Sequence, residues 1–336
     1  MSSEIVRFGV LGASAIAQDK VLPALLKAGN ARADLLGTRS PAARSEVAER
    51  FQISRGAVTM DEAIADDQLD AIYVSLPNSL HAEWIIKALQ AGKPVLSDKP
   101  LTVSGAEAER VAEVSRATGL PVMEGYMYRF HPQHRYIRQR IADGSIGTVR
   151  EARAFFLFHM LQAVSATDIR VVDGPGAGAL MDMGCYTISA VRMVMGGEPI
   201  SATGWRVRNS NGLDVGGVAN LLFPEERRAQ VSWGWDTGNG GNLQVIGTKA
   251  ILETGNPFVP DQGNPGETVV TELAGQGRLI EHRFDTVDQF QLEFEEFAGA
   301  IIEGREPMWT VDDAVQQAKA MDLVRALPAL DELARS

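Results

Sequence analysis

Apolar and polar positions follow two different patterns along the chain, and the change falls near residue 127. Before it, short apolar runs alternate with longer stretches in which apolar residues recur every three or four positions. The runs predict β-strands and the longer stretches predict helices. The predicted strands cover residues 5–11, 33–38, 71–76, 93–98 and 121–126. This alternation predicts an α/β fold whose parallel sheet is covered by helices on both faces.

After residue 127 the predicted strands are longer, and one of them alternates strictly. In residues 228–236, Ala229, Val231 and Trp233 fall on one face, whereas Gln230 and Ser232 fall on the other. A period of two is typical of a half-buried strand. Residues 149–160 and 242–254 are also expected to be extended, and residues 131–144 to be helical. We predict a largely antiparallel sheet in this half.

The change of pattern predicts two domains, residues 1–126 and residues 127–310, as the length of 336 residues also suggests. An apolar stripe at helical spacing, expected to be core, consists of Phe290, Phe294, Phe297 and Ile301. A last helix, residues 311–328, is expected to pack back on the first domain.

Composition excludes several classes of function. The net charge of −11 disfavours nucleic acid and anionic membranes as partners. Neither an apolar signal core at the N-terminus nor a run long enough to span a bilayer is found. The single cysteine, Cys185, allows no internal disulfide and suits a reducing compartment. We therefore expect a cytoplasmic protein.

A turn rich in small residues follows the first predicted strand and opens a helix. Gly12, Ser14 and Ala17 occupy the three positions of the G-x-G-x-x-G/A dinucleotide fingerprint, with Ala15 and Ile16 between them. Gly12 permits the tight turn, and the helix N-terminus presents N–H groups to a pyrophosphate. Ser14 replaces the second glycine, and its hydroxyl could donate to the pyrophosphate. The surrounding strand–helix alternation favours a cofactor site over a merely compact turn.

The end of the second strand predicts which cofactor binds. An acidic residue there would accept a hydrogen bond from the ribose 2′-hydroxyl of NAD. The chain instead has Thr38, Arg39 and Ser40, with Arg44 a turn later. Arginine and hydroxyl groups match a 2′-phosphate, so we expect NADP(H), although Arg39 could also be a solvated loop residue.

Three further side chains are candidates for chemistry. Lys99 follows a parallel strand, at the edge where α/β sheets bind ligands, although such a lysine can simply be solvated. Asp182 and Tyr186 lie four residues apart and would share a helix face, either as a structural pair or as a reactive one. His131 and His134 lack a neighbouring carboxylate or cysteine cluster, so no metal site is expected.

Motifs along nearly the whole chain resemble the Gfo/Idh/MocA oxidoreductases. They are the Gly12 turn and residues 76–81, 98–100, 124–132 and 178–186. The resemblance implies a Rossmann domain followed by an α/β domain whose large open sheet binds substrate on one side and mediates homo-oligomerisation, as a homodimer or homotetramer. The family usually has Glu-Lys-Pro where this chain has Asp98-Lys99-Pro100. Many members have histidine at the position of Tyr186, whereas tyrosine is typical of the branch containing glucose–fructose oxidoreductase, dimeric dihydrodiol dehydrogenase and NADP-dependent D-xylose dehydrogenase.

The resemblance also implies roles for individual residues. Family positions near the cofactor correspond to Leu76, Pro77, Asn78, His81, Asp98, Lys99 and Arg129. Asn78 and His81 could instead be a helix cap and a solvated histidine, and Arg129 a salt-bridge residue. Arg170 matches a loop arginine that reaches substrate hydroxyls, so the expected substrate-binding residues are Lys99, Arg170, Asp182 and Tyr186.

These side chains suggest a mechanism for exchanging hydride with an alcohol. Free tyrosine, with a pKa of about 10, is protonated at neutral pH, and a nearby lysine cation favours the phenolate. We hypothesise that Tyr186 is the general acid/base, Lys99 its electrostatic partner and Asp182 the orienting group. Lys99 acting directly on the proton remains an alternative. The leading reaction is NADP-dependent oxidation of an aldose at C1, or its reverse; trans-dihydrodiol oxidation, keto-sugar reduction and a non-catalytic NADP sensor are the alternatives.

Overall fold

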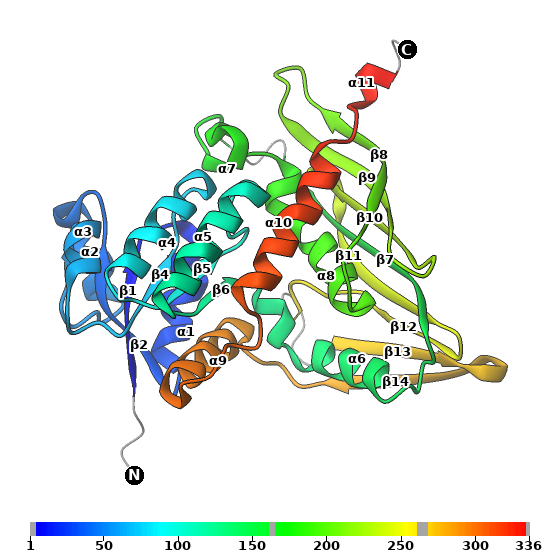
Figure 1. The fold of residues 1–336 in the computed structure, drawn as a ribbon, viewed down its shortest axis with the longest axis horizontal. Helices are drawn as coiled ribbons and strands as arrows, with labels where there is room; N and C mark the ends of the chain where they lie inside the picture. The colour runs from blue at the N-terminus through cyan, green and yellow to red at the C-terminus, as the bar shows by residue number, and fades with distance from the viewer. Residues whose placement is uncertain (1–4, 161–164, 261–267, 334–336) are drawn as a thin grey trace. The chain divides into compact units, whose positions relative to one another are not determined.

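The computed structural model describes residues 5–160, 165–260 and 268–333, shown as a ribbon in Figure 1. The chain forms two compact units. The first comprises Met1–Met127 and Asp288–Ala318, and the second comprises Tyr128–Val287 and Lys319–Ser336. Within the described ranges, none of the helices is both long and apolar enough to cross a bilayer.

The first unit is built on a parallel sheet of six strands in the order β3-β2-β1-β4-β5-β6. This is the order of a Rossmann fold, which reverses direction between β1 and β4. The strands are β1 (Val6–Leu11), β2 (Ala31–Gly37), β3 (Ala57–Val58), β4 (Ala71–Val74), β5 (Val95–Asp98) and β6 (Val122–Gly125). The α/β class predicted from the apolar runs is confirmed.

Helices cover both faces of this sheet, as continuous apolar strands require. They are η1 (Ala17–Val21), α1 (Leu22–Lys27), α2 (Pro41–Arg50), α3 (Met60–Ala65), η2 (Asn78–Leu80), α4 (His81–Gln90) and α5 (Gly105–Thr118). Local signals set their ends: Thr59 forms a capping box with Glu62 at the start of α3, and Gly119 ends α5 in the left-handed conformation. On one face, side chains of α3, α4 and α5 form a buried core with Leu35, Ile72 and Val74.

The opposite face of the sheet is covered by α9 (Gln289–Glu303), a helix expected in the second domain from the change of pattern near residue 127. Phe294 packs edge-to-face on Phe8 of β1 with 5.3 Å between ring centroids, and 5.1 Å from Tyr73 of β4. Burying these rings against the parallel sheet ties α9 to the first unit. The next helix, α10 (Val311–Arg325), begins in the first unit, where Val311, Ala314, Val315 and Ala318 join the core.

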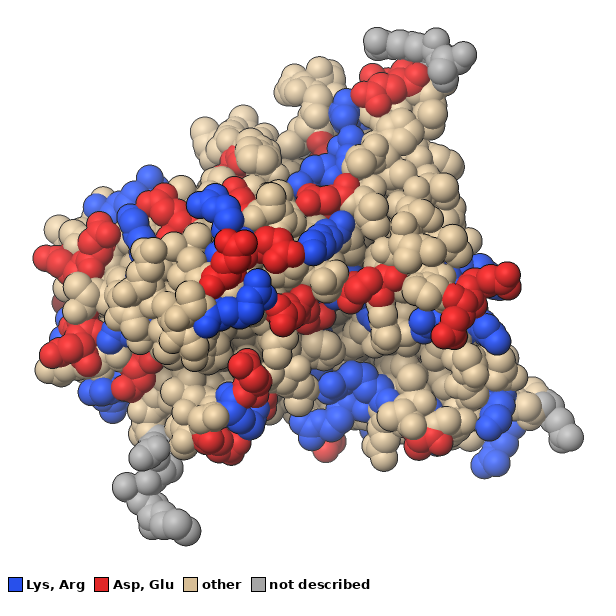
Figure 2. Space-filling view, in the orientation of Figure 1, with Lys and Arg blue, Asp and Glu red and all other residues tan. Residues whose placement is uncertain are grey.

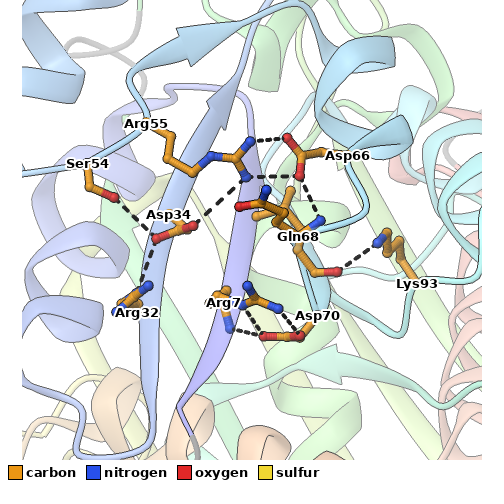
Figure 3. A network of polar contacts seen from close by, with 10 residues as sticks. Arg7, Arg32, Asp34, Ser54, Arg55, Asp66, Gln68, Asp70 and Lys93 are labelled. Carbon is orange, nitrogen blue, oxygen red and sulfur yellow. Dashed lines mark hydrogen bonds and ion pairs between the residues drawn. The ribbon is translucent and has the colours of Figure 1, made fainter.

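A polar network occupies the edge of the sheet where β1 and β4 begin (Figure 3). Arg7 donates from Nε and Nη2 to the two carboxylate oxygens of Asp70, both at 2.9 Å, and this pairing lowers the pKa of Asp70. Arg55 pairs with Asp66, and Asp34 accepts from Arg32 and Ser54. Asp34 therefore belongs to this network at the amino edge, away from the carboxyl edge where dinucleotides bind.

The second unit contains eight strands in the order β14-β13-β12-β11-β7-β10-β9-β8. All neighbours are antiparallel except β7 and β10. The strands are β7 (Val149–His159), β8 (Ser201–Arg208), β9 (Asp214–Leu222), β10 (Arg228–Gly234), β11 (Asp236–Gly247), β12 (Ala250–Thr254), β13 (Thr268–Ala274) and β14 (Arg278–Phe284). Ala229, Val231 and Trp233 of β10 are buried as the alternation predicts. The mostly antiparallel second sheet is confirmed.

The other elements of the second unit are η3 (Met127–Phe130), α6 (Pro132–Ala142), α7 (Ile169–Val172), η4 (Gly174–Gly176), η5 (Leu180–Gly184), α8 (Cys185–Met195), η6 (Gly275–Gly277) and α11 (Leu330–Leu333). Helix α8 is almost entirely buried and lies against β7 and β10. It follows η5 without a break, so the segment carrying Asp182 and Tyr186 is fixed on the centre of the sheet.

Candidate active site

The predicted dinucleotide turn lies at the carboxyl end of β1, next to the point where the strand order reverses. Gly12 has a φ of +95°, and a Cβ added there would lie 2.3 Å from the carbonyl oxygen of Ser75. Its N–H donates to the carbonyl of Gly37 at 2.8 Å. Only glycine fits this conformation and this close approach of β1 to β4. The residues present therefore fit the phosphate turn of a Rossmann fold.

Ser14, which stands at the second glycine position, uses its hydroxyl inside the protein. Its Oγ lies 2.6 Å from Oγ of Ser75 and accepts from the N–H of Ala17 at 3.1 Å. The serine thus caps the start of the helix and links it to the end of β4. The pyrophosphate contact expected of Ser14 stays a prediction.

The end of β2 carries the residues expected to select the cofactor. Thr38 is buried, and its N–H donates to Val58, whereas Arg39 and Ser40 are exposed. Arg44 is half-buried on α2. Residues 37–40 include no carboxylate, so this strand end offers cationic and hydroxyl groups, which suit a phosphate better than a ribose diol.

His81 links the ends of β4 and β5. Its ring is fully buried, with Nε2 2.9 Å from the carbonyl oxygen of Leu76 and Nδ1 2.9 Å from that of Pro100. The alternative of a solvated histidine is therefore wrong. The imidazole holds together the two loops that contain Pro77, Asn78 and Lys99.

Lys99 is half-buried directly after β5. Its backbone N–H donates to Oδ1 of Asp98 at 2.8 Å, and its peptide bond to Pro100 is cis. One residue on, the N–H of Leu101 donates to the buried carboxylate of Glu124 at 2.8 Å. The loop carrying Lys99 is thus fixed from β5, β6 and His81. Glu124 begins a family motif, but neither its contact with Leu101 nor the contact of Ser75 with Ser14 had a signal in the sequence, because only the fold brings these residues together.

In the second unit, Asp182 and Tyr186 lie on consecutive turns of η5 and α8. The η5 turn is π-helical, a distortion common at functional sites. Two glycines allow it to lie close to the sheet: Gly178 has a φ of +98° against Asp214, and a Cβ on Gly184 would lie 3.1 Å from Trp233. These two glycines therefore let the turn lie close to strands of its own sheet.

Tyr186 is surrounded by aromatic rings. Its ring centroid lies 5.4 Å from Phe156, 5.6 Å from Phe258 and 5.8 Å from Tyr128. Such a surround excludes water and strengthens electrostatic interactions with the phenol oxygen. Phe156 and Phe258 have no distinguishing signal in the sequence, because an aromatic residue in a strand or loop has the same pattern as a core residue.

The structure brings Arg170 into the electrostatic field of Asp182. Arg170 forms a two-point ion pair with Asp168, with bonds of 2.9 and 2.8 Å. This hydrogen bonding chiefly raises the pKa of Arg170, and the charge of Asp182 adds to the effect. Arg170, Asp182 and Tyr186, three of the four predicted substrate-binding residues, therefore belong to the second unit, and Lys99 belongs to the first.

Arg129 and the two histidines near it have structural contacts. Arg129 is buried and donates to Oγ of Ser189 on α8 from Nε (3.1 Å) and Nη2 (2.8 Å). His131 accepts from the N–H of Gln133 and caps α6. Nε2 of His134 lies 2.6 Å from the carbonyl oxygen of Pro257, and burial lowers the pKa of His134 to about 3. No metal-binding group of three or more ligand residues occurs in the part of the chain that the structure describes.

Both units match models of one family of nicotinamide-dependent oxidoreductases. A model of the GFO/IDH/MocA oxidoreductase family, NAD-binding Rossmann fold, matches residues 6–126. A model of the GFO/IDH/MocA C-terminal domain matches residues 134–253. The chain belongs to the Gfo/Idh/MocA family, as its motifs indicated, and the expected nicotinamide cofactor agrees with the NAD(P) that this family binds.

Individual relatives cover nearly the whole chain. D-xylose 1-dehydrogenase (NADP(+)) 2 of Haloferax volcanii is 32% identical over 320 residues, which cover 94% of this chain and 95% of that protein. The dTDP-3,4-didehydro-2,6-dideoxy-alpha-D-glucose 3-reductase of Actinomadura kijaniata is 33% identical over 325 residues, with 95% of each chain covered.

A solved structure agrees with the fold. The 3-ketoreductase KijD10 from Actinomadura kijaniata, in complex with NADP and TDP-benzene, matches with a TM-score of 0.85 and 32% identity, covering 97% of this chain and 98% of that chain. Solved variants of that ketoreductase replace one tyrosine by phenylalanine and one lysine by alanine or glutamate.

Replacing His81 by alanine should weaken both the fold and the site. The change leaves a cavity and leaves the carbonyls of Leu76 and Pro100 without the imidazole, which should cost about 3 kcal/mol in the free energy of unfolding. Turnover should fall as well, because the loop carrying Lys99 loses a support. Urea unfolding and steady-state rates measure the two effects. His159→Ala, at an exposed histidine, is the matched control; equal effects of the two changes would contradict the role given to His81.

Proposed function

We propose that this protein is an NADP(H)-dependent oxidoreductase that transfers hydride between the nicotinamide and a sugar. The preferred reaction is oxidation of an aldose at C1 to its lactone, or the reverse reduction. The observation that carries the proposal is the grouping of Arg170, Asp182 and the ring-enclosed Tyr186 in one unit of a family whose other unit binds NAD(P). Several polar groups beside aromatic rings suit a sugar.

In the proposed mechanism, the residues of the chain handle the proton. Bound nicotinamide accepts hydride in the oxidation and donates it in the reduction. In the oxidation, the substrate hydroxyl gives its proton to the Tyr186 phenolate while its carbon loses hydride, so that C–OH becomes C=O. Lys99 stabilises the phenolate and donates a hydrogen bond to the substrate oxygen. Asp182, beside Arg170, orients the substrate through a neighbouring hydroxyl.

Reduction of a keto sugar is the second candidate, because the ketoreductase of Actinomadura kijaniata matches the chain as well as the xylose dehydrogenase does. A panel of aldoses, trans-dihydrodiols and nucleotide-linked keto sugars with NADP(H) separates the reactions. The absence of any nicotinamide oxidation or reduction in this panel would favour a non-catalytic sensor. Retention of Lys99, Asp182 and Tyr186 argues against the sensor, since sensing requires no proton transfer.

Cofactor choice is proposed to depend on the residues after β2. Thr38, Arg39, Ser40 and Arg44 would hold the 2′-phosphate of NADP, and Gly12, Ala15 and Ile16 the pyrophosphate. The loops of Leu76, Pro77, Asn78 and Asp98 would lie along the nicotinamide half. His81 acts by positioning these loops, and Arg129 by supporting α8.

The compartment is proposed from the cysteine content. The single cysteine, Cys185, is buried on α8, and we propose that the enzyme works in the reducing environment of the cytoplasm.

The open face of the second sheet is the proposed oligomer interface. Trp205, Val218 and Phe155 are 43%, 36% and 37% exposed, and Trp205 pairs with Val218 across β8 and β9. Ser232 of β10 pairs with both Val218 and Phe155, so this row crosses four strands and has an apolar residue on three of them; it is called the apolar row below. Exposed apolar rows of this kind indicate an interface, and we propose a homodimer or homotetramer.

Removing the proposed proton-transfer groups should abolish turnover without unfolding the protein. In Tyr186→Phe, the ring packing is kept and the phenol oxygen is lost, so kcat should fall by about 10²–10⁴. Lys99→Met should give a comparable loss. NADP affinity, measured by fluorescence titration, should remain near the wild-type value in Tyr186→Phe. Near wild-type rates in both variants would exclude the assignment, whereas loss in Lys99→Met with an active Tyr186→Phe would make Lys99 the acid/base.

Removing Arg39 should affect NADP more than NAD. In Arg39→Ala, a charge-assisted contact to the 2′-phosphate is lost, and KM for NADP⁺ should rise about tenfold or more. KM for NAD⁺ should change little. Arg50→Ala, at an exposed arginine further along α2, is the control. An equal rise for both cofactors would count against a 2′-phosphate contact at Arg39.

Placing a charge in the apolar row should dissociate the oligomer. Trp205→Glu would bury a carboxylate at the interface, so light scattering after gel filtration should give a monomer mass. Ile302→Glu, at an exposed position on α9, is the control and should leave the mass unchanged. An unchanged mass in Trp205→Glu would place the interface elsewhere.

A further inference from the structure

Three arginines line a cavity of about 250 Å³ in the second unit. Its walls come from residues 174–181, from β8 and β9, and from the end of α10. Arg206, Arg208 and Arg325 line it together with a single acidic residue, Asp214. Figure 2 shows basic side chains gathered over the end of α10 and beside α11. In a chain whose net charge is −11, such a concentration of positive charge needs an explanation.

Arg206 is the most enclosed of the three. Its side chain is 13% exposed, and its Nε donates to the carbonyl of Leu327 at 3.0 Å. Burial lowers the pKa of Arg206, and the charges of Arg208 and Arg325 add to this lowering, whereas the charges of Asp214 and Glu332 partly offset it. An anion in the cavity would relieve this repulsion. The carboxylates that pair with Arg208 and Arg325, Glu332 and Asp322, are 52% and 41% exposed, so solvent screens their effect.

Asp214 adds a hydrogen-bond acceptor to this basic lining. Its Oδ1 accepts from the N–H of Leu180 at 3.0 Å and from Nε1 of Trp233 at 3.2 Å. Its Oδ2 is buried and accepts no hydrogen bond from the described residues; the nearest cation, Nη1 of Arg206, is 4.0 Å away. Burial raises the pKa of this carboxyl. A buried oxygen of this kind calls for a donor, which a ligand hydroxyl can supply.

We propose that this cavity binds a phosphate group that carries a hydroxyl. Guanidinium groups bind phosphate oxygens through paired charge-assisted hydrogen bonds. The three arginines and Asp214 leave the lining with two net positive charges, which match the monohydrogen phosphate dianion. The hydroxyl of that ion donates to Oδ2 of Asp214. The source is either free phosphate or a small phosphate ester with its own hydroxyls, and the proposal is independent of the reaction proposed above.

Sulfate provides the sharpest test. It has the size and charge of monohydrogen phosphate, but it carries no proton near neutral pH and cannot donate to Asp214. Calorimetric titration of the full chain, saturated with NADP so that phosphate sites for the cofactor are filled, should give binding of inorganic phosphate. Sulfate at matched ionic strength should bind about tenfold or more weakly, because it leaves a charged acceptor unsatisfied. Equal binding of the two anions, or no binding of phosphate, would overturn the proposal.

Substitutions locate the site. Arg208→Met and Arg325→Met should each weaken phosphate binding about tenfold or more, since each removes a charge-assisted contact. Arg283→Met, at an exposed arginine on β14, is the matched control and should bind as the wild type does. Asp214→Asn keeps an acceptor for Leu180 and Trp233 and should bind sulfate as well as phosphate. Equal weakening in Arg208→Met, Arg325→Met and Arg283→Met would reduce the effect to general charge and refute the site.

The source of the phosphate can be decided with glucose 6-phosphate as the probe. Competition between this ester and inorganic phosphate, lost in Arg325→Met, would support the site and show that it accepts esters. Binding of inorganic phosphate without such competition would support the site as one for the free ion. Competition that persists unchanged in both Arg208→Met and Arg325→Met would place the phosphate elsewhere and overturn the proposal.

Discussion

The two contacts of the His81 imidazole, with the carbonyls of Leu76 and Pro100, fix the ends of β4 and β5 relative to each other. A Rossmann sheet binds its cofactor beyond the carboxyl ends of its strands, where loops have few backbone partners of their own. A buried ring with two polar atoms supplies those partners without solvent. Glu124 on β6 extends the same support to Leu101, so the loop of Lys99 has an anchor on three neighbouring strands.

In the second unit, close packing fixes the segment that carries Asp182 and Tyr186. Glycines at 178 and 184 let the η5 turn lie on the sheet, against Asp214 and Trp233. Asp214 holds the N–H of Leu180 from one side, and the rings around Tyr186 hold α8 from the other. Asp182 is thereby left half-buried between fixed neighbours. A rigid turn of this kind holds a carboxylate and a phenol in a defined relation, which the proton transfer proposed for Tyr186 requires.

Individual residues show which features of the fold and the candidate site could be predicted from the sequence. The parallel sheet around Gly12 followed from apolar runs, because parallel strands buried on both faces leave a strong signal. His81 was selected from a family motif, but its burial was not foreseen, since a histidine after a strand has the same sequence signal whether it is solvated or enclosed. Phe294 was recognised as core, yet its attachment to β1 and β4 depends on which sheet α9 covers. Asp214 carried no signal, because its partners lie 34 and 19 residues away in sequence.

The α/β class, the position of the dinucleotide turn, the family and the candidates Lys99, Asp182 and Tyr186 could all be predicted from the order of residues alone. Periodicity and short motifs are local properties, so they survive in a linear sequence. The tertiary structure was needed to show that Ser14 caps its helix and bonds to Ser75, that aromatic rings enclose Tyr186, and that three arginines meet Asp214 around one cavity. These contacts join residues far apart in the chain. Their energies depend on burial, and burial is established only when the backbone has folded.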